Sequence, residues 1–303
     1  MYHFIVNPAS RSGKGEKLWK ETIKPILEQK KVQYEVHFSK KPGDLIELAK
    51  EYGKNKAHLV VVGGDGTVNE VLQGISNLDD VYFSYIPTGS SNDLARDLEY
   101  PKDKEQVLAG ILNQPMDFLM DVGQLTTSKG DRAFAVSCGI GFDAAVCYGT
   151  LHSKVKSTFN KLGLGKLTYL GEALKNLLFS RRAVCDIELD NGRFIRTKRT
   201  LFVAVMNHRY EGGGFKFCPA ADAQDGILDV FVASGLPSLL ILFALPTAFY
   251  GKHLIFPGMN AYQTTSVRVK SSRPMWVHTD GEVLSQEKEI KVNLKDQKLH
   301  FMY

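Results

Sequence analysis

The chain has 303 residues, of which 44% are hydrophobic and 23% charged, a balance that excludes disordered and fibrous proteins. This length suggests about two domains, and the formal net charge is +5. The four cysteines are widely spaced, form no CxxC pair and lie in apolar runs, which indicates reduced, buried thiols and a cytoplasmic location. The first residues carry no signal-peptide pattern, and no nucleic-acid partner is expected.

Strand and helix patterns alternate along the first third of the chain. Short apolar or alternating runs predict strands at residues 2–6, 34–38, 59–62 and 81–86. Helical spacing of apolar residues predicts helices at 17–29, after Asp44, at 68–75 and near Leu94. This order predicts an α/β domain over residues 1–122, with an open, mostly parallel sheet covered by helices on both faces.

From about residue 120 the pattern becomes strand-rich. Strands are predicted at 132–138, 184–189, 200–206, 228–233, 267–270 and 289–294. These runs predict a β-rich, sandwich-like second domain over residues 123–295. The most apolar segment, residues 236–249, contains Pro246 and is shorter than the roughly 20 residues that span a bilayer, so a transmembrane helix is not expected.

A glycine-rich loop, Gly63 to Thr67, follows the apolar run 59–62 and precedes a predicted helix. At the carboxyl end of a parallel strand, glycines allow backbone amides to approach a phosphate at the helix N-terminus. Asp65 is too close to the backbone to be a distant base, and holding a magnesium ion is the role that we assign to it. The alternative is a plain tight turn.

Other nucleotide signatures fail. A Walker A loop would need a glycine at Pro8 and a hydroxyl at Gly15. The GxGxxA match at Gly139, Gly141 and Ala144 lies outside any βαβ unit. Three histidines have no partner at metal-ligand spacing and are expected to be ordinary surface or core residues: His208, His253 and His278.

A second loop, residues 87–93, leaves the next strand and enters a helix. Several motifs then follow in a fixed order: PTGSSNDLAR from Pro87, GIGFDA from Gly139, GGGF from Gly212, DGILDV from Asp225 and HTDGE from His278. Together with GGDGT they resemble the diacylglycerol kinase catalytic-domain family, particularly its small bacterial lipid kinases. The resemblance covers essentially the whole chain. The sequence departs from the family's usual GTxNDFAR at Ser90 and Leu94.

The resemblance implies a site for ATP and magnesium. The nucleotide-binding positions that match the family are Asn7, Pro8, Ser10, Arg11, Ser39, Gly64, Asp65, Gly66, Thr67, Asn69, Glu70 and Ser90. Asp65 and Asp93 would organise the catalytic magnesium, and Asp280 and Glu282 are the two candidates for the general base. A second, structural magnesium would be held by the Asp225 side chain and the backbone carbonyls of Asp222 and Ile227. The final segment, residues 296–303, would return to the first domain.

The expected function is therefore transfer of the ATP γ-phosphate to the hydroxyl of a membrane lipid, with diacylglycerol as first choice. Phosphoryl transfer needs positioning, magnesium and a carboxylate that accepts the alcohol proton, and the motifs provide each part. Without the other motifs, Asp280 and Glu282 would equally suit a hairpin turn. Two alternatives stay open: an NAD kinase-like enzyme, and a catalytically silent lipid- or nucleotide-binding regulator.

The lipid substrate implies contact with a membrane. Cations at 154–182, interleaved with apolar residues, are predicted to attract an anionic surface, so the protein is expected at the inner face of the membrane as a peripheral protein. A solvated helix face is the alternative. The sequence leaves open which lipid alcohol is used (diacylglycerol, a ceramide or sphingoid base, a monoacylglycerol or phosphatidylglycerol) and the oligomeric state, a homodimer included.

Overall fold

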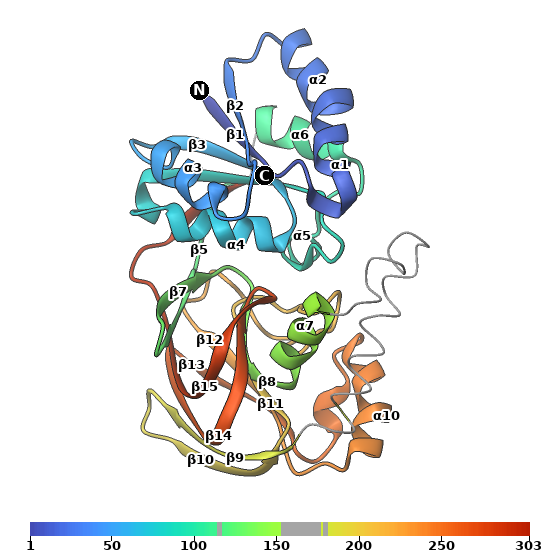
Figure 1. Ribbon diagram of the computed structural model, residues 1–303, viewed down its shortest axis with the longest axis vertical. Helices are drawn as coiled ribbons and strands as arrows, with labels where there is room; N and C mark the ends of the chain where they lie inside the picture. Colours follow the sequence, from blue (N-terminus) through green and yellow to red (C-terminus); the bar gives the residue numbers. More distant parts are fainter. Residues whose placement is uncertain (114–116, 153–176, 178–180) are drawn as a thin grey trace.

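The computed structural model describes residues 1–113, 117–152, 177 and 181–303. Two β-sheets divide the molecule, as Figure 1 shows: a six-stranded α/β sheet and, below it, a ten-stranded sheet. Among the described residues, every strand pairing in the larger sheet is antiparallel. The predicted combination of an α/β domain and a β-rich domain is confirmed.

The six-stranded sheet has the strand order β2-β1-β3-β4-β16-β5. Its strands are β1 (Tyr2–Val6), β2 (Tyr34–Phe38), β3 (Ala57–Gly63), β4 (Val81–Pro87), β5 (Asp117–Met120) and β16 (Leu299–Met302). All neighbours are parallel except β16 and β5, which are antiparallel. Strand β16 comes from the end of the chain, so the C-terminus lies in the upper domain of Figure 1.

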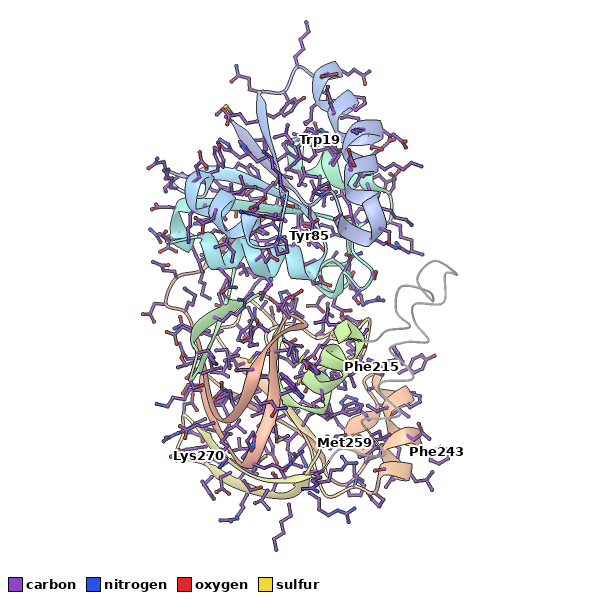
Figure 2. All side chains as sticks on the ribbon, in the orientation of Figure 1. Trp19, Tyr85, Phe215, Phe243, Met259 and Lys270 are labelled. Carbon is purple, nitrogen blue, oxygen red and sulfur yellow. The ribbon has the colours of Figure 1, made fainter. Side chains whose placement is uncertain are left out.

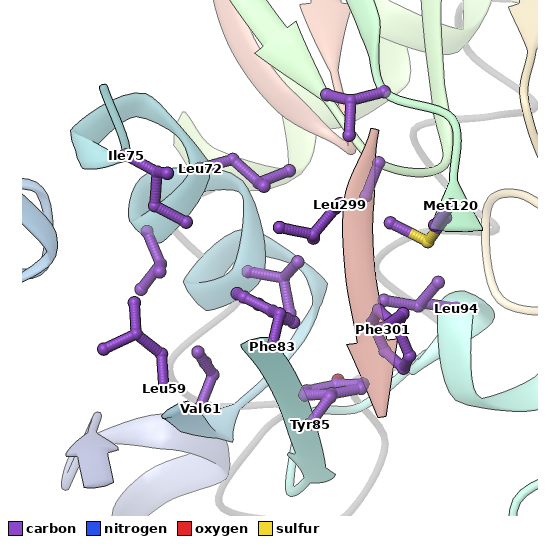
Figure 3. Close-up of a cluster of buried hydrophobic side chains, with 14 of the residues drawn as sticks. Leu59, Val61, Leu72, Ile75, Phe83, Tyr85, Leu94, Met120, Leu299 and Phe301 are labelled. Carbon is purple, nitrogen blue, oxygen red and sulfur yellow. The ribbon is translucent and has the colours of Figure 1, made fainter. Parts of the chain in front are cut away.

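Helices cover both faces of this sheet, which explains the continuous apolar run in β3. Leu59 and Val61 pack into the buried cluster of Figure 3, together with Leu72 from a helix and Phe83 from β4. Val60 and Val62 point to the opposite face. The helical segments are α1 (Ser10–Leu18), the π-helix η1 (Trp19–Ile23), α2 (Lys24–Gln29), α3 (Asp44–Tyr52), α4 (Asp65–Gly74), the 3-10 helix η2 (Leu78–Asp80), α5 (Asp93–Asp97) and α6 (Lys104–Asn113).

The single helix predicted at 17–29 was wrong in its bounds. Regular helical backbone follows the left-handed residues Arg11 to Gly13, and η1 divides it before α2 starts. Pro25 follows η1 in the first turn of α2 and has no N–H, so it cannot donate the backbone hydrogen bond that a regular α-helix would make at this point. The buried Trp19 at the start of η1 contacts Phe4 of β1, and this packing holds the segment on the sheet.

The ten-stranded sheet follows the path β13-β12-β11-β8-β14-β15-β6-β7, with β9 joining β14 to β10. Its strands are β6 (Gly123–Thr127), β7 (Gly130–Phe134), β8 (Ser137–Gly141), β9 (Ala183–Leu189), β10 (Phe194–Thr200), β11 (Phe202–Met206), β12 (Leu228–Ala233), β13 (Met259–Thr264), β14 (Ser266–Thr279) and β15 (Glu282–Leu294). The strand predicted at 132–138 is two strands, because the amides of Ala135 and Val136 bind a carboxylate and leave the ladder.

Helices α7 (Phe142–His152) and α10 (Ser238–Ala248) and the 3-10 helix η3 (His253–Ile255) accompany this sheet. The apolar segment at 236–249 forms α10, and no helix in the described parts of the chain is long and apolar enough to cross a bilayer. Met259 is buried near α10, whereas Phe243 points outward (Figure 2). All four cysteines are free; Cys147 is partly exposed and the other three are buried.

Candidate functional site

Two glycine-rich loops meet at the carboxyl ends of β3 and β4. Gly64 and Gly89 lie against each other, so that a Cβ added to Gly89 would be 2.6 Å from the Gly64 Cα. The Thr67 hydroxyl accepts hydrogen bonds from the Asn7 side chain (3.1 Å) and from the Gly64 amide (3.3 Å). Ser90 is exposed on the second loop. Glycine is required here because the two backbones touch.

The turn after β1 is tied to both loops. Asn7 Oδ1 accepts the Ala9 amide, and the Pro8 carbonyl accepts the Glu16 amide. Ser10 Oγ lies 2.6 Å from the Thr88 hydroxyl of the second loop. Three consecutive residues, Arg11 to Gly13, have left-handed backbone angles, which bend the chain tightly at this point. The predicted first nucleotide-binding turn therefore lies beside the predicted phosphate loops.

A cavity of about 460 Å³ opens between this turn and the second loop. Its lining includes five cationic side chains and one acidic residue, Glu21; the cations are Arg11, Lys14, Lys17, Lys102 and Lys104. Cavities of this size hold small ligands, and this charge suits a polyphosphate. Sequence reasoning missed Lys17, Lys102 and Lys104, because only the fold brings their segments together. Ser39 follows β2 and donates its amide to the Val6 carbonyl, but it does not line the cavity.

Asp65 and Asp93 begin the two helices that follow the loops, α4 and α5. Asp65 accepts the backbone amides of Asp93 (3.1 Å) and Leu94 (3.4 Å), which are at the N-terminus of α5. Desolvation and the Asp93 carboxylate raise the pKa of Asp65 to about 7. Burial also raises the pKa of Asp93, whose Oδ2 accepts the Gly213 amide at 2.7 Å. Two close carboxylates with raised pKa values fit a cation of the magnesium type.

The turn between β14 and β15 carries Asp280, and the second domain presents it to α4. Asp280 and Gly281 both have positive φ angles, as a two-residue hairpin requires. The Asp280 carboxylate accepts the amides of Ala135, Val136 and Ser137 and the Asn69 side chain, at 2.8–3.0 Å. Both oxygens are thus occupied by four donors. Asp280 and Gly281 therefore form a hairpin turn, and this turn also faces the GGDGT helix α4. The two interpretations that the sequence left as alternatives are compatible.

Glu282 lies across the domain boundary from the GGDGT loop. A Cβ added to Gly66 would be 2.5 Å from Glu282 Oε1, so this carboxylate rests directly on the glycine. No hydrogen bond joins Glu282 to another side chain in the described ranges, and its side chain is partly exposed. Burial and Glu282 raise the pKa of Glu70, one turn along α4. Glu282 thus lies at the domain boundary without a hydrogen bond to a described side chain, whereas four donors hold Asp280.

A buried cluster behind the turn was not expected from the sequence. His278 is fully buried, and its Nε2 lies 3.2 Å from Asp143 Oδ2 and 3.3 Å from Glu211 Oε1. Its Nδ1 accepts the Gly281 amide at 3.1 Å, which places the ring hydrogen on Nε2, facing the two carboxylates. These carboxylates raise the pKa of His278 against the effect of its burial. The cluster thus orients the turn through the contact of His278 with Gly281, and the ligand atoms of its three members lie within 4.8 Å of one another.

The same cluster explains the GIGFDA motif. A Cβ added to Gly139 would be 1.9 Å from Asp143 Oδ2, and Gly141 has a φ of +129°. The GxGxxA pattern therefore reflects close packing around His278 and not dinucleotide binding. His208 and His253 are also buried: His208 Nδ1 lies 2.7 Å from Asp97, and His253 Nε2 lies 3.0 Å from the Phe217 carbonyl.

The loop before β12 contains the residues expected to hold a second cation. Asp225 N donates to the Asp222 carbonyl, and Asp225 Oδ1 accepts the Ile227 amide. Burial and the neighbouring carboxylates of Asp222 and Asp121 raise the pKa of Asp225. Burial and Asp225 raise that of Asp229 to about 6, and the buried Asp229 Oδ2 has no hydrogen-bond partner. Several neighbouring carboxylates, one of them with an unpaired buried oxygen, form a site that fits a hard cation such as Mg²⁺.

The fold and site define a two-domain protein of the NAD kinase and diacylglycerol kinase type. Residues 1–124 match the diacylglycerol kinase catalytic domain, and residues 137–298 match the YegS C-terminal NAD kinase β sandwich-like domain. The chain therefore belongs to the family of diacylglycerol kinase and YegS-like lipid kinases.

Relatives agree with this assignment. YtlR of Bacillus subtilis is 27% identical over 93% of both chains, and the diacylglycerol kinase of the same organism is 27% identical over 92% of this chain and 88% of its own. A solved diacylglycerol kinase structure from Bacillus anthracis has a TM-score of 0.72 at 21% identity and covers 100% of this chain and 96% of its own. An Archaeoglobus fulgidus NAD kinase, solved with ATP, has a TM-score of 0.52 at 14% identity, over 99% and 93% of the two chains.

Proposed function

We propose that this chain transfers the γ-phosphate of ATP to the hydroxyl of a membrane lipid, with diacylglycerol as the preferred acceptor. The observation that carries the proposal is the position of Glu282, whose carboxylate lies on Gly66 at the start of α4. A proton acceptor from one domain thus lies directly beside the phosphate-loop helix of the other. Family membership supports a lipid as the acceptor.

The cationic cavity is the proposed site for ATP. The Arg11 and Lys14 side chains line it beside Thr88 and Gly89 of the second loop. Lysine and arginine neutralise phosphate oxygens, and the N-terminus of α4, which follows the GGDGT loop, favours an anion. The triphosphate would extend from this cavity toward Gly66, which places its γ-phosphate near Glu282.

Glu282 is the proposed general base, in preference to Asp280. The lipid hydroxyl oxygen attacks the γ-phosphorus, the bond from that phosphorus to the bridging oxygen breaks, ADP leaves, and the hydroxyl proton passes to Glu282. Asp280 cannot take this role without giving up one of its four hydrogen bonds. Its proposed role is to hold the turn, so that Glu282 meets the acceptor hydroxyl at a fixed position.

Asp65 and Asp93 are the residues that would hold magnesium, which when bound neutralises phosphate charge. Asp65 is anchored by the α5 amides, and Asp93 by the Gly213 amide. These anchors fix both carboxylates before any ligand arrives. The glycine loop at 212–214 would therefore contribute to the site by positioning Asp93.

The test is a kinase assay with purified full-length protein, radiolabelled ATP, Mg²⁺ and separate acceptors. The acceptors are diacylglycerol, monoacylglycerol, ceramide, a sphingoid base, phosphatidylglycerol and NAD. We expect labelled phosphatidic acid as the main product. Labelled NADP would support the NAD kinase alternative, and an absence of product from every acceptor would support a silent regulator.

We also propose that the exposed apolar surface of α10 and η3 docks on an anionic membrane. Large apolar side chains on this surface are 36–79% exposed: Leu239, Leu242, Phe243, Phe249, Tyr250, Leu254 and Ile255. Residues 236–258 contain no acidic residue and include Lys252, and Arg182 donates a hydrogen bond of 2.9 Å to Ser238 at the start of α10. This composition suits the interface of an anionic bilayer. Most of the predicted basic stretch, residues 153–176 and 178–180, lies outside the described residues.

A further inference from the structure

Three potential metal ligands lie on one face of the β1–β2 strand pair, away from the glycine loops. The strands are parallel, and His3 is directly opposite Glu35 in the register. His37 is two residues beyond Glu35 on β2, so both side chains point to the same face of the sheet. That face is the one on which α3 packs, because Tyr52 at the end of α3 stacks on the His37 ring at 3.7 Å.

The two imidazoles point at the same carboxylate without forming hydrogen bonds to it. His3 Nδ1 lies 3.5 Å from Glu35 Oε2, and His37 Nε2 lies 3.6 Å from the same oxygen. Both nitrogens are buried and have no hydrogen-bond partner among the described residues. A buried polar atom without a partner is unfavourable, so something outside the chain is needed to satisfy both nitrogens.

The spacing of these atoms fits a metal ion. The ligand atoms of His3, Glu35 and His37 all lie within 4.8 Å of one another. Zinc–nitrogen bonds of about 2.0–2.1 Å in a tetrahedron give ligand–ligand distances of ~3.3–3.4 Å, slightly shorter than the two distances here. Tyr52 restrains the rings further, since it also stacks on His3 at 5.2 Å.

The donor set selects the class of metal. Two imidazole nitrogens and one carboxylate oxygen suit Zn²⁺ and its neighbours among the first-row transition metals, whereas Mg²⁺ prefers oxygen ligands alone. We propose that His3, Glu35 and His37 bind one transition-metal dication of the Zn²⁺ type, with a fourth position open to water. The ion would clamp the edge strand β2 to β1 and is separate from the magnesium that the proposed kinase reaction uses.

The experiment uses the full-length protein after removal of metals with a chelator. Zn²⁺ binding is measured by titration calorimetry with Mg²⁺ in excess, and Co²⁺ serves as a spectroscopic probe of tetrahedral coordination. We expect one Zn²⁺ per chain, a visible Co²⁺ spectrum and an upward shift in Tm with Zn²⁺. His3→Ala and His37→Ala should each weaken binding at least tenfold.

His300→Ala is the matched control, because His300 faces a single carboxylate, Asp117, at 3.7 Å and belongs to no such group within the described part of the chain. It should bind Zn²⁺ like the wild type. If a histidine variant does not fold, Glu35→Gln at the half-exposed edge decides the question and should weaken binding and shift the Co²⁺ spectrum. The proposal is overturned if the wild type binds no Zn²⁺, or if binding survives in the His3→Ala, His37→Ala double variant. Zn²⁺ binding is measured without any kinase assay, so this test remains valid even if the proposed kinase function is wrong.

Discussion

The side-chain amide of Asn69 donates a hydrogen bond of 2.9 Å to Asp280 Oδ2, and this contact joins helix α4 to the β14–β15 turn. Asn69 is fully buried and also accepts a hydrogen bond from Arg132 at 2.9 Å. The turn is therefore positioned by contacts from both domains. This arrangement separates the roles of Asp280 and Glu282, which the next two predictions distinguish.

Glu282→Gln is expected to reduce kcat by about 10²–10⁴-fold while leaving the Tm unchanged, because it removes a proton acceptor that makes no hydrogen bond to any side chain the structure describes. Steady-state kinetics with diacylglycerol and a thermal melt measure both quantities. A folded variant with wild-type kcat would exclude Glu282 as the general base.

Asp280→Asn is expected to lower stability as well as activity. In the wild type, the backbone amides of residues 135–137 donate to the Asp280 carboxylate; in the variant, the side-chain NH₂ group would face some of these same donors. The loss of charge-assisted hydrogen bonds should lower the free energy of unfolding by about 2 kcal/mol or more. Urea unfolding measures the change in the free energy of unfolding. If this variant is as stable as the wild type but inactive, Asp280 acts in the chemistry and not in holding the turn.

Stability should depend on pH through Asp65, whose pKa is raised to about 7. The native state binds this proton more tightly than the unfolded state does, so the free energy of unfolding falls as pH rises from about 4 through 7. In a chelator, we expect wild-type stability to decrease between about pH 4 and pH 7, and Asp65→Asn to show a smaller decrease.

Asp296→Asn is the control, because it changes an exposed carboxyl that is distant from Asp65 in the sequence. The pH dependence of its free energy of unfolding should match that of the wild type. Added Mg²⁺ should reduce the slope of the wild type if Asp65 binds the ion, because the cation stabilises the carboxylate. Equal slopes for wild type and Asp65→Asn would contradict the assignment.

Mg²⁺ bound at the proposed second-domain site should raise the Tm of the nucleotide-free protein. Asp225→Ala is expected to abolish this contribution to the Tm. Glu188→Ala is the control, since Glu188 is an exposed carboxylate on β9 and does not belong to the loop before β12. Thermal melts with and without Mg²⁺ compare the variants. Equal Mg²⁺ stabilisation of Asp225→Ala and wild type would remove the second magnesium site.

Phe243→Ser should weaken binding to anionic vesicles, because Phe243 is 66% exposed on α10. Loss of a buried phenyl ring at the bilayer interface should cost about 2 kcal/mol, or roughly 30-fold in partitioning. Phe194→Ser is the control, since Phe194 is 59% exposed on β10, away from the apolar surface. Co-sedimentation that is the same for both variants would exclude α10 as the docking surface.

The sequence by itself determined the two-part architecture and the two phosphate loops. Period-two and period-3.6 patterns reflect which side chains are buried on each strand and helix, and these are local properties of the chain. Glycine at positions 63, 64, 66 and 89 could also be recognised from the sequence, because close approach of neighbouring atoms leaves no room for a Cβ there. The order of the motifs then indicated the family.

Only the tertiary structure decided which carboxylate is held and which is free. Asp280 and Glu282 are two residues apart, yet the first meets three amides from 135–137 and the second meets Gly66, contacts that depend on docking of segments far apart in the chain. The spacing of residues along the sequence likewise did not reveal the His278 cluster or the group formed by His3, Glu35 and His37. Their members come together because strand pairing in a sheet brings distant residues into register, and no local pattern encodes that pairing.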